Sequence, residues 1–190
     1  MKTIFSTATL VALLGALASA APTKLATRSV LTTFGADFYF VLDGANPNTL
    51  SGATSAGEIE RINGNNEVDT LVSFTIPPYT SIPGASASST CQLVIRNPST
   101  VTGSGETQIF TLGGAISSAN QYSFYQHPFY DQYRGVQQAN LGTDSTPIDV
   151  QSFPCGFGGN LQLALRPQND NDLIEFSQTS TTGLFIEDLS

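Results

Sequence analysis

Apolar and polar residues alternate with period two along most of the chain, most clearly at residues 68–76 and 91–96. The apolar positions of one parity are Val72, Phe74 and Ile76 in the first segment and Cys91, Leu93 and Ile95 in the second. Each segment stops at a proline, which lacks the N–H that a β ladder needs. We interpret both as strands around which the rest of the chain is arranged.

The same alternation predicts further short strands, separated by turns rich in Gly, Pro, Asn and Ser. They fall at residues 37–42, 58–62, 107–112, 135–141, 147–153, 160–165, 172–176 and 183–186. After residue 20, no window of about twelve residues keeps an amphipathic helical repeat. The pattern predicts an all-β fold: a single antiparallel β-sandwich of the jelly-roll or immunoglobulin-like kind, with one disulfide.

The first 20 residues are expected to be a signal peptide. A basic start precedes an apolar stretch from Ile4 to Leu17, and Ala18-Ser19-Ala20 supplies a small-residue cleavage pattern. The alternative is a membrane anchor, but the apolar run is shorter than the roughly 20 residues that a span needs. We expect residues 21–36 to form a flexible lead, residues 37–190 to form the β-sandwich domain, and the protein to be secreted, extracellular or in a cell wall.

Charge narrows the range of partners. Removal of Lys2 leaves six Lys and Arg against fifteen Asp and Glu. Such an acidic chain repels nucleic acid and anionic membranes, and we expect neither a nucleic-acid partner nor a membrane span. Cell-wall polysaccharide or an extracellular protein fits better as a partner. The sequence has no phosphate cradle or dinucleotide fingerprint, and we expect no cofactor.

Cys91 and Cys155 are the two cysteines of the chain. Secretion into an oxidising environment favours a bridge between them, which the chain-entropy model values at about 4 kcal/mol for a loop of this length. Two buried free thiols are the alternative. A metal site is not expected, because two cysteines and one distant histidine lack a recognisable ligand spacing.

The residues of hydrolytic chemistry form no recognisable set. His127 is the single histidine, and no nucleophile elbow accompanies it, so we assign no catalytic residue. Paired carboxylates could hydrolyse a glycoside, and Glu58 with Glu60, or Glu187 with Asp188, are the nearest pairs in sequence. Asn169–Asp172 could offer oxygens to calcium, but its spacing departs from the calcium-loop pattern and is typical of a hairpin turn.

The densest aromatic stretch, Tyr122 to Tyr133, is the best candidate for binding. Tyrosine presents a flat amphipathic face to a sugar or a protein partner. We expect Phe124 and Phe129 to belong to the core. The candidate binding residues are Tyr122, Tyr125, His127, Tyr130 and Tyr133.

Several short motifs resemble one family. They are Phe74-Thr75-Ile76-Pro77, Cys91 with Leu93, Phe153-Pro154-Cys155, and the closing strands that contain Phe176 and GLFIEDL. Together they resemble the fungal But-two C-terminal domain family, also called ubiquitin 3 binding protein, C-terminal domain. The resemblance covers roughly residues 37–190 and implies a small secreted fungal β-sandwich. It transfers no catalytic residue, and the intracellular partner in the family name conflicts with the expected signal peptide.

Three functional hypotheses follow from these patterns. The leading one is a non-catalytic secreted protein that binds or builds a fungal cell wall or surface. The second is a polysaccharide-active hydrolase that uses two carboxylates from different strands, favoured by two acids within about 5 to 10 Å in one cleft. The third is a secreted protein-partner module or effector, favoured by an exposed apolar patch.

Overall fold

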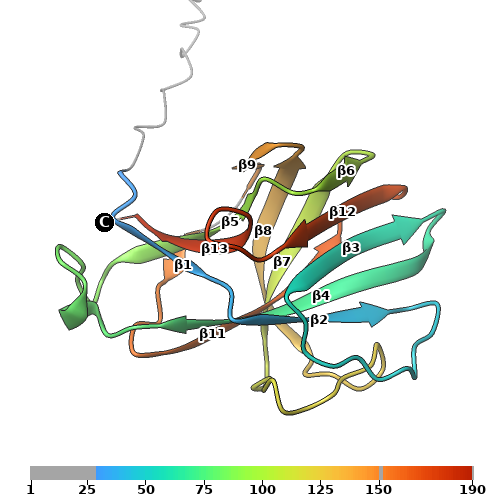
Figure 1. The fold of residues 1–190 in the computed structure, drawn as a ribbon, viewed down its shortest axis with the longest axis horizontal. Coiled ribbons are helices and arrows are strands. Elements are labelled where there is room, and N and C mark those ends of the chain that lie inside the picture. The colour runs from blue at the N-terminus through green and yellow to red at the C-terminus, as the bar shows by residue number, and fades with distance from the viewer. Residues whose placement is uncertain (1–28, 150–151, 190) are drawn as a thin grey trace, which may run out of the picture.

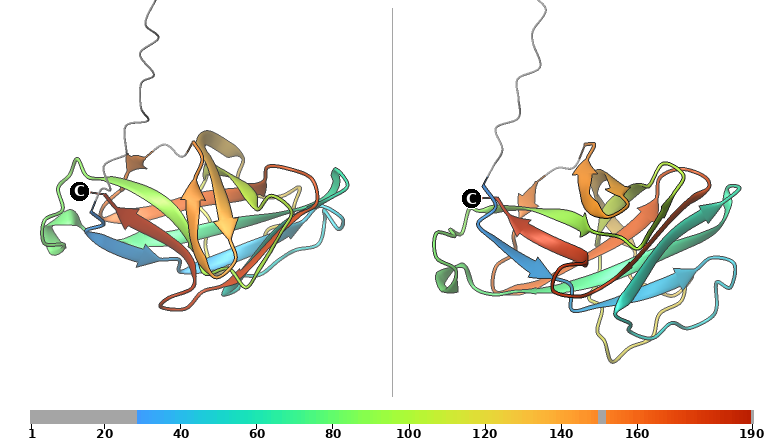
Figure 2. Two further views of the ribbon diagram at one scale, coloured as in Figure 1. Left: turned by 90° about the horizontal axis from the view of Figure 1, so that it is seen from above. Right: turned by 45° about the horizontal axis from the view of Figure 1, so that its top comes forward.

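Two antiparallel sheets enclose the main core of the protein, and the larger sheet curls around the smaller one (Figures 1 and 2). The computed structural model describes residues 29–149 and 152–189. The helical content of these ranges is a single 3₁₀ turn, η1 (Tyr79–Ser81). Within them, no helix is long and apolar enough to cross a membrane. The predicted all-β antiparallel fold with one disulfide is confirmed.

The smaller sheet has the order β1 (Thr32–Gly35), β13 (Gly183–Asp188), β5 (Thr90–Arg96) and β10 (Phe153–Pro154). The larger sheet runs β6 (Thr100–Thr102), β12 (Asp172–Ser177), β3 (Ala56–Ile62), β4 (Asn65–Ile76), β11 (Gly159–Pro167), β7 (Glu106–Leu112), β8 (Tyr130–Asn140) and β9 (Thr143–Pro147). Strand β2 (Phe38–Asp43) also pairs with β4. Strands adjacent in sequence, such as β4 and β5, therefore lie in different sheets.

Strand β4 is buried on both of its faces. Val72, Phe74 and Ile76 point into the main core between the two sheets, where they join Leu93 and Ile95 of β5. Leu71 points to the opposite side, which we call the outer face of the larger sheet, and packs in a second apolar cluster. Period-two alternation explains both directions, since successive side chains of a strand lie on opposite faces.

The second cluster has a cover of its own. Residues 113–129, which we call the strap, connect β7 to β8 and cross the outer face (yellow segment in Figure 1). Ile116 of the strap is 4% exposed, and the Tyr122 ring meets the Phe40 ring edge-on at 4.8 Å. The Gln162 side chain both accepts a hydrogen bond from the Ile116 N–H, at 2.9 Å, and donates one to its carbonyl, at 2.8 Å. The strap is thus part of the folded core.

The observed strands agree with most of the predicted ones. Strand β6, at residues 100–102, lies where no strand is predicted, and two expected segments also differ. Residues 32–35, within the segment expected as a flexible lead, form β1 and pair with β13. The single segment expected at 147–153 is instead the end of β9 and the start of β10, with a bend at residues 148–149. The expected signal peptide lies outside the described residues.

A disulfide joins Cys91 to Cys155, as the sequence predicts, and both residues are buried. Cys91 lies on β5, and Phe153 of β10 is its partner in register. The bridge therefore fixes the edge of the smaller sheet to the segment that leads into β11, across a sequence separation of 64 residues. Its main stabilising effect is to restrict the unfolded chain.

The first prediction concerns this bridge. The double variant Cys91→Ala/Cys155→Ala should lose about 4 kcal/mol of the free energy of unfolding in urea, because the unfolded chain regains the entropy of a long loop. Intact mass should rise by two hydrogens when the wild-type protein is reduced. An unchanged mass, or a loss of stability below about 1 kcal/mol, would contradict the bridge or its role.

Candidate functional site

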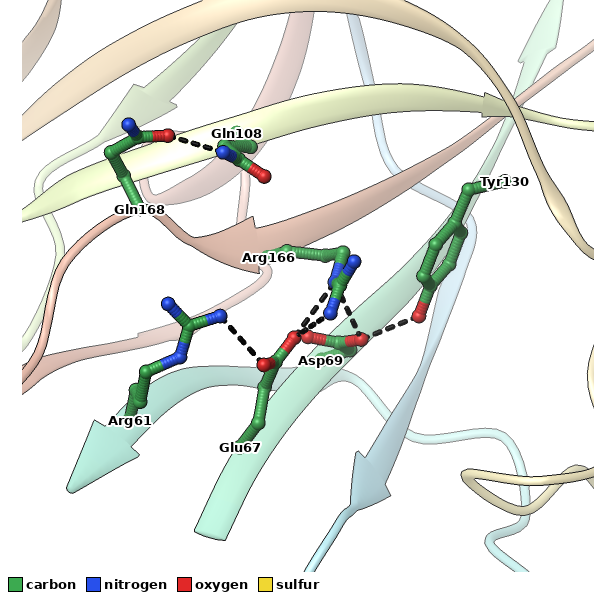
Figure 3. Close-up of polar contacts among 7 residues, drawn as sticks. All are labelled: Arg61, Glu67, Asp69, Gln108, Tyr130, Arg166 and Gln168. Atoms are coloured by element: carbon green, nitrogen blue, oxygen red, sulfur yellow. Dashed lines mark hydrogen bonds and ion pairs between the residues drawn. The ribbon is translucent and has the colours of Figure 1, made fainter. Parts of the chain in front are cut away.

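A half-buried cluster of charges lies on the outer face beside the second apolar cluster. Glu67 and Asp69 have the same parity on β4 and point to this face, and Arg166 on the adjacent strand β11 reaches both. Tyr130 at the start of β8 and Arg61 on β3 complete it. We call Arg61, Glu67, Asp69, Tyr130 and Arg166 the charge cluster (Figure 3).

Hydrogen bonds and ion pairs connect all five members. Arg166 donates from Nε to Glu67 at 2.7 Å and also pairs with Asp69 at 3.2 Å. Arg61 donates to the other Glu67 oxygen at 2.6 Å, and the Tyr130 hydroxyl donates to Asp69 at 2.5 Å. The Arg166 guanidinium also lies 4.9 Å from the centre of the Tyr130 ring. These contacts draw strands β3, β4, β8 and β11 together.

Asp69 is the unusual member of the charge cluster, because its side chain is fully buried. Burial raises its pKa to about 7, against the opposing effect of the Arg166 charge, and the nearby Glu67 charge adds to the rise. The Oδ1 atom of Asp69 accepts no hydrogen bond within the described ranges. When Asp69 is protonated, its carboxyl can donate a hydrogen bond to Glu67, which also raises its pKa. Asp69 therefore holds a proton more tightly than an exposed aspartate does.

Glu67 behaves in the opposite way. Burial by itself raises the pKa of Glu67, but hydrogen bonds from Arg61 and Arg166 outweigh it, and its pKa falls below the ordinary value. Burial also raises the pKa of Tyr130, and the Asp69 charge adds to that rise. At neutral pH Glu67 is thus the anion that the two arginines hold, and Tyr130 is a hydrogen-bond donor.

Four rings continue from this cluster across the outer face, and we call them the aromatic row. His127 stacks on Tyr130 at 4.9 Å between centroids, Tyr130 stacks on Phe110 at 5.6 Å, and Phe110 meets Tyr133 edge-on at 5.6 Å. His127, Tyr130 and Phe110 are half-buried, whereas Tyr133 is 44% exposed. The Tyr133 hydroxyl donates to the Asp149 carboxylate, the nearer oxygen lying at 3.3 Å.

The sequence-predicted aromatic residues therefore divide into three environments. His127, Tyr130 and Tyr133 lie together in the row, whereas Tyr122 is half-buried against Phe40 on the inner side of the strap. Tyr125 is 70% exposed and lies apart from the row's ring contacts.

The expectation that both phenylalanines of this stretch belong to the core is wrong for Phe129, which is 66% exposed. Its ring lies over Gly113, where an added Cβ would come within 2.1 Å of the ring, so the glycine provides the room. Phe124 is half-buried and packs against the second apolar cluster.

A separate acidic cleft runs between β2 and the pair β3 and β12. It has two adjoining parts of about 470 and 430 Å³, and Val41 and Glu58 line both. Glu58 pairs in register with Glu175 across the strands. Burial raises the pKa of Glu58, and the charges of Glu60, Glu175 and Asp43 raise it further. The expected pair Glu58 and Glu60 thus shares a cleft, whose single aromatic among the described lining residues is the buried Phe176.

No protein-family model matches the chain, and no curated protein matches it significantly. The assignment of a function therefore depends on the two features just described, the outer face and the acidic cleft.

Two other predicted candidates have structural roles. Asn169–Asp172 leads into β12 through a turn, and the Asp172 carboxylate accepts hydrogen bonds from the N–H and hydroxyl of Ser104 at 2.5 and 2.7 Å. Cys91, Cys155 and Asp188 are the one group of close metal-type ligands in the described ranges, and the bridge occupies both sulfurs. Glu187 pairs with Arg96 at 2.7 Å.

Sequence reasoning did not find Glu67, Asp69, Arg166 or Phe110. A weak signal exists, because Glu67 and Asp69 flank Val68 at the start of a strand that the sequence predicts to be central, and a buried charge there needs a partner. The partner, Arg166, is about a hundred residues away in sequence. Only the register of β4 with β11 places it opposite.

The second prediction concerns Asp69 and pH. A carboxyl whose pKa is raised by folding stabilises the fold fully below its unfolded pKa of about 3.9, and this contribution is lost as pH rises through 7. The free energy of unfolding of the wild type relative to Asp69→Asn should therefore fall by up to about 1.4 kcal/mol per pH unit between these values. Urea unfolding at several pH values measures it.

The matched control is Asp172→Asn, which alters a buried acid outside the charge cluster. The free energy of unfolding of Asp172→Asn should keep the part of the pH dependence that Asp69 contributes in the wild type. If the free energy of unfolding varies with pH in parallel for the wild type and Asp69→Asn, then Asp69 has the same pKa in the folded and unfolded states, and the prediction is wrong.

Proposed function

We propose that this protein is a secreted, non-catalytic β-sandwich protein that binds cell-wall or surface polysaccharide through the outer face of its larger sheet. The aromatic row carries this proposal. Sugar rings pack their apolar faces on aromatic side chains, while nearby polar groups bond their hydroxyls. Tyr133 offers an exposed ring. Phe110 packs against that ring, and Tyr130 stacks on Phe110.

The groups around the exposed end of the row suit hydroxyl-rich ligands. The Asp149 carboxylate accepts a hydrogen bond from the Tyr133 hydroxyl at 3.3 Å, and Asp131 and Gln132 are exposed beside Tyr133 on β8. Further along the same face, Gln108 donates to Gln168 (Figure 3). Amides, carboxylates and hydroxyls beside aromatic rings supply both donors and acceptors at the surface. An extended polysaccharide needs such a surface rather than an enclosed pocket.

Three properties read from the sequence support a wall or extracellular location. They are the expected signal peptide, the acidic composition, and the strand motifs that resemble the But-two C-terminal domain family. The bridge between Cys91 and Cys155 agrees with them, since disulfides persist in oxidising compartments. A fungal origin and membership of that family are part of the proposal.

The third prediction tests binding directly. Purified protein incubated with isolated fungal wall, chitin and glucan should be retained on at least one fraction. Tyr133→Ala should weaken that retention about fivefold or more, because the exposed stacking face is lost, and such a face is worth on the order of 1 kcal/mol.

The chain offers a matched control, Tyr79→Ala. Tyr79 is 40% exposed and meets Phe157 edge-on at 6.2 Å, so it resembles Tyr133 in exposure but belongs to η1. It should bind like the wild type. Failure of the wild type on every fraction counts against polysaccharide and directs the search to an extracellular protein partner. Equal loss in both variants would remove the aromatic row from the proposal.

A polysaccharide hydrolase is the second candidate, and the acidic cleft favours it. The Cβ atoms of residues paired across antiparallel strands lie about 5 Å apart, so Glu58 and Glu175 can flank one bond. Retaining glycosidases hold their two carboxyls at about 5–5.5 Å. The raised pKa of Glu58 suits a general acid.

The fourth prediction separates the two candidates. If the cleft is catalytic, the wild type releases reducing sugar from a wall polysaccharide, and Glu58→Gln and Glu175→Gln each reduce the rate by at least about a hundredfold. Tyr133→Ala would then weaken substrate binding with little effect on the turnover rate. If the primary proposal holds, the wild type releases no sugar, and both glutamine variants are retained on the wall fractions like the wild type.

A further inference from the structure

We propose that the exposed end of the aromatic row binds an amino-sugar polymer, a deacetylated chitin, and that Asp149 selects this polymer by pairing with the ammonium group of a glucosamine unit stacked on Tyr133. The inference rests on the proposed function, because it names the substrate class of the same surface. It adds a specificity-determining residue, Asp149, to the ring that carries the sugar.

The first step is the position of Asp149 at the tip of the Tyr133 ring. The Tyr133 hydroxyl donates to Oδ2 of Asp149 at 3.3 Å, and the Val136 N–H of β8 donates to Oδ1 at 2.5 Å. The backbone is fixed to the same place, since the Ile148 N–H donates to the Val136 carbonyl at 2.9 Å. The carboxylate and the ring therefore keep a defined position relative to each other.

The second step is the acceptor capacity that Asp149 has left. A carboxylate has about four lone-pair sites. In the part of the chain that the structure describes, the Val136 N–H and the Tyr133 hydroxyl are the two groups that donate to it. Asp149 is exposed, so its other acceptor sites are open to a ligand. An ionised carboxylate has no proton to donate, and the ligand group that meets it must therefore be a donor.

The third step is the charge at this place. None of the ion pairs within residues 29–149 and 152–189 involves Asp149. Arg134, the cation next to Tyr133 in sequence, donates to Gln132 at 2.5 Å instead. The chain as a whole has an excess of acids, so it attracts cationic polymers and repels anionic ones. A positively charged donor thus fits this carboxylate better than a neutral one.

The fourth step is the Tyr133 ring itself. Phe110 supports it edge-on at 5.6 Å, and 44% of Tyr133 stays exposed to a ligand. A pyranose that packs on this ring places its equatorial substituents around the ring edge, where the Asp149 carboxylate lies. An ammonium substituent gains both the carboxylate and the negative face of the ring. An N-acetyl group replaces that charge with a neutral amide, so deacetylated units are favoured.

Two soluble ligands of equal length test this selection: the hexamer of glucosamine and the hexamer of N-acetylglucosamine. Their dissociation constants are measured by calorimetry at a mildly acidic pH, at which the amines carry protons. At about 0.01 M salt the wild type should bind the glucosamine hexamer about fivefold more tightly. The two affinities should approach each other at about 1 M salt, because the screening length falls to about 3 Å.

Three variants separate charge from stacking. Asp149→Asn keeps an acceptor for the Val136 N–H but removes the charge, so it should abolish the preference and leave the affinity for the N-acetylglucosamine hexamer unchanged. Tyr133→Ala should weaken the binding of both hexamers. The matched control is Asp170→Asn, an exposed acid in the turn before β12, which changes the net charge by the same amount and should keep the preference.

Two results would overturn the role of Asp149. One is a preference for the glucosamine hexamer that persists in Asp149→Asn. The other is an equal decrease in Asp149→Asn and Asp170→Asn, because the attraction would then come from the overall charge. A decrease in Glu58→Gln without one in Asp149→Asn also contradicts the inference, and would assign the cationic polymer to the acidic cleft.

Failure of this inference is distinguishable from failure of the proposed function. Equal affinity for the two hexamers, or no binding of the glucosamine hexamer, overturns the selection of amino sugars. If Tyr133-dependent retention on a wall, chitin or glucan fraction is still found, the proposed function stands. Absence of retention on every fraction, together with no binding of either hexamer, contradicts both.

Discussion

Burial of β4 on both faces is the constraint on which the rest of this structure depends. An antiparallel sheet normally covers one face and leaves the other to water. Here the smaller sheet covers one face of β4 and the strap covers the other, so seven successive residues, 68–74, are all buried. The curled larger sheet, the long connection between β7 and β8, and the disulfide at the edge all serve to enclose this strand.

The buried polar side chains of β4 need hydrogen-bond partners, and neighbouring strands supply most of them. Thr70, which is fully buried, donates from its hydroxyl to the Glu58 carbonyl at 2.6 Å, and Ser73 lies within reach of the Gln162 amide. Among these buried polar side chains, Asp69 is compensated least completely, because burial favours its protonated form. The charge cluster is thus a consequence of placing an acid on a strand that has no solvent-facing side.

Much of the fold could be predicted from sequence because its signals are local. Period-two alternation locates β2, β4, β5, β11 and β12, and prolines end β4 and β5. The bridge was predictable from two cysteines in a chain whose first 20 residues are expected to be a signal peptide. By contrast, alternation says nothing about which of two apolar parities faces the core, so the second apolar cluster and the burial of Tyr122 were not predictable. Phe129 was assigned to the core because it is apolar, but it lies on an exposed glycine at the strap's end.

The site was harder to predict than the fold, since its members come together only through strand register and the path of the strap. Tyr130 and His127 were identified as aromatic candidates, but their partners Asp69, Arg166 and Phe110 lie on three other strands. The same strap that completes the core thereby presents the aromatic row, which links the packing of the protein to its proposed binding surface.

The most direct test of this account is a nuclear Overhauser spectrum of the folded protein. It predicts cross-peaks between the ring protons of Tyr122 and Phe40, whose centroids are 4.8 Å apart. Absence of these cross-peaks, together with an unprotected Tyr122 amide, would show that the outer face of β4 is open to water and would contradict the account.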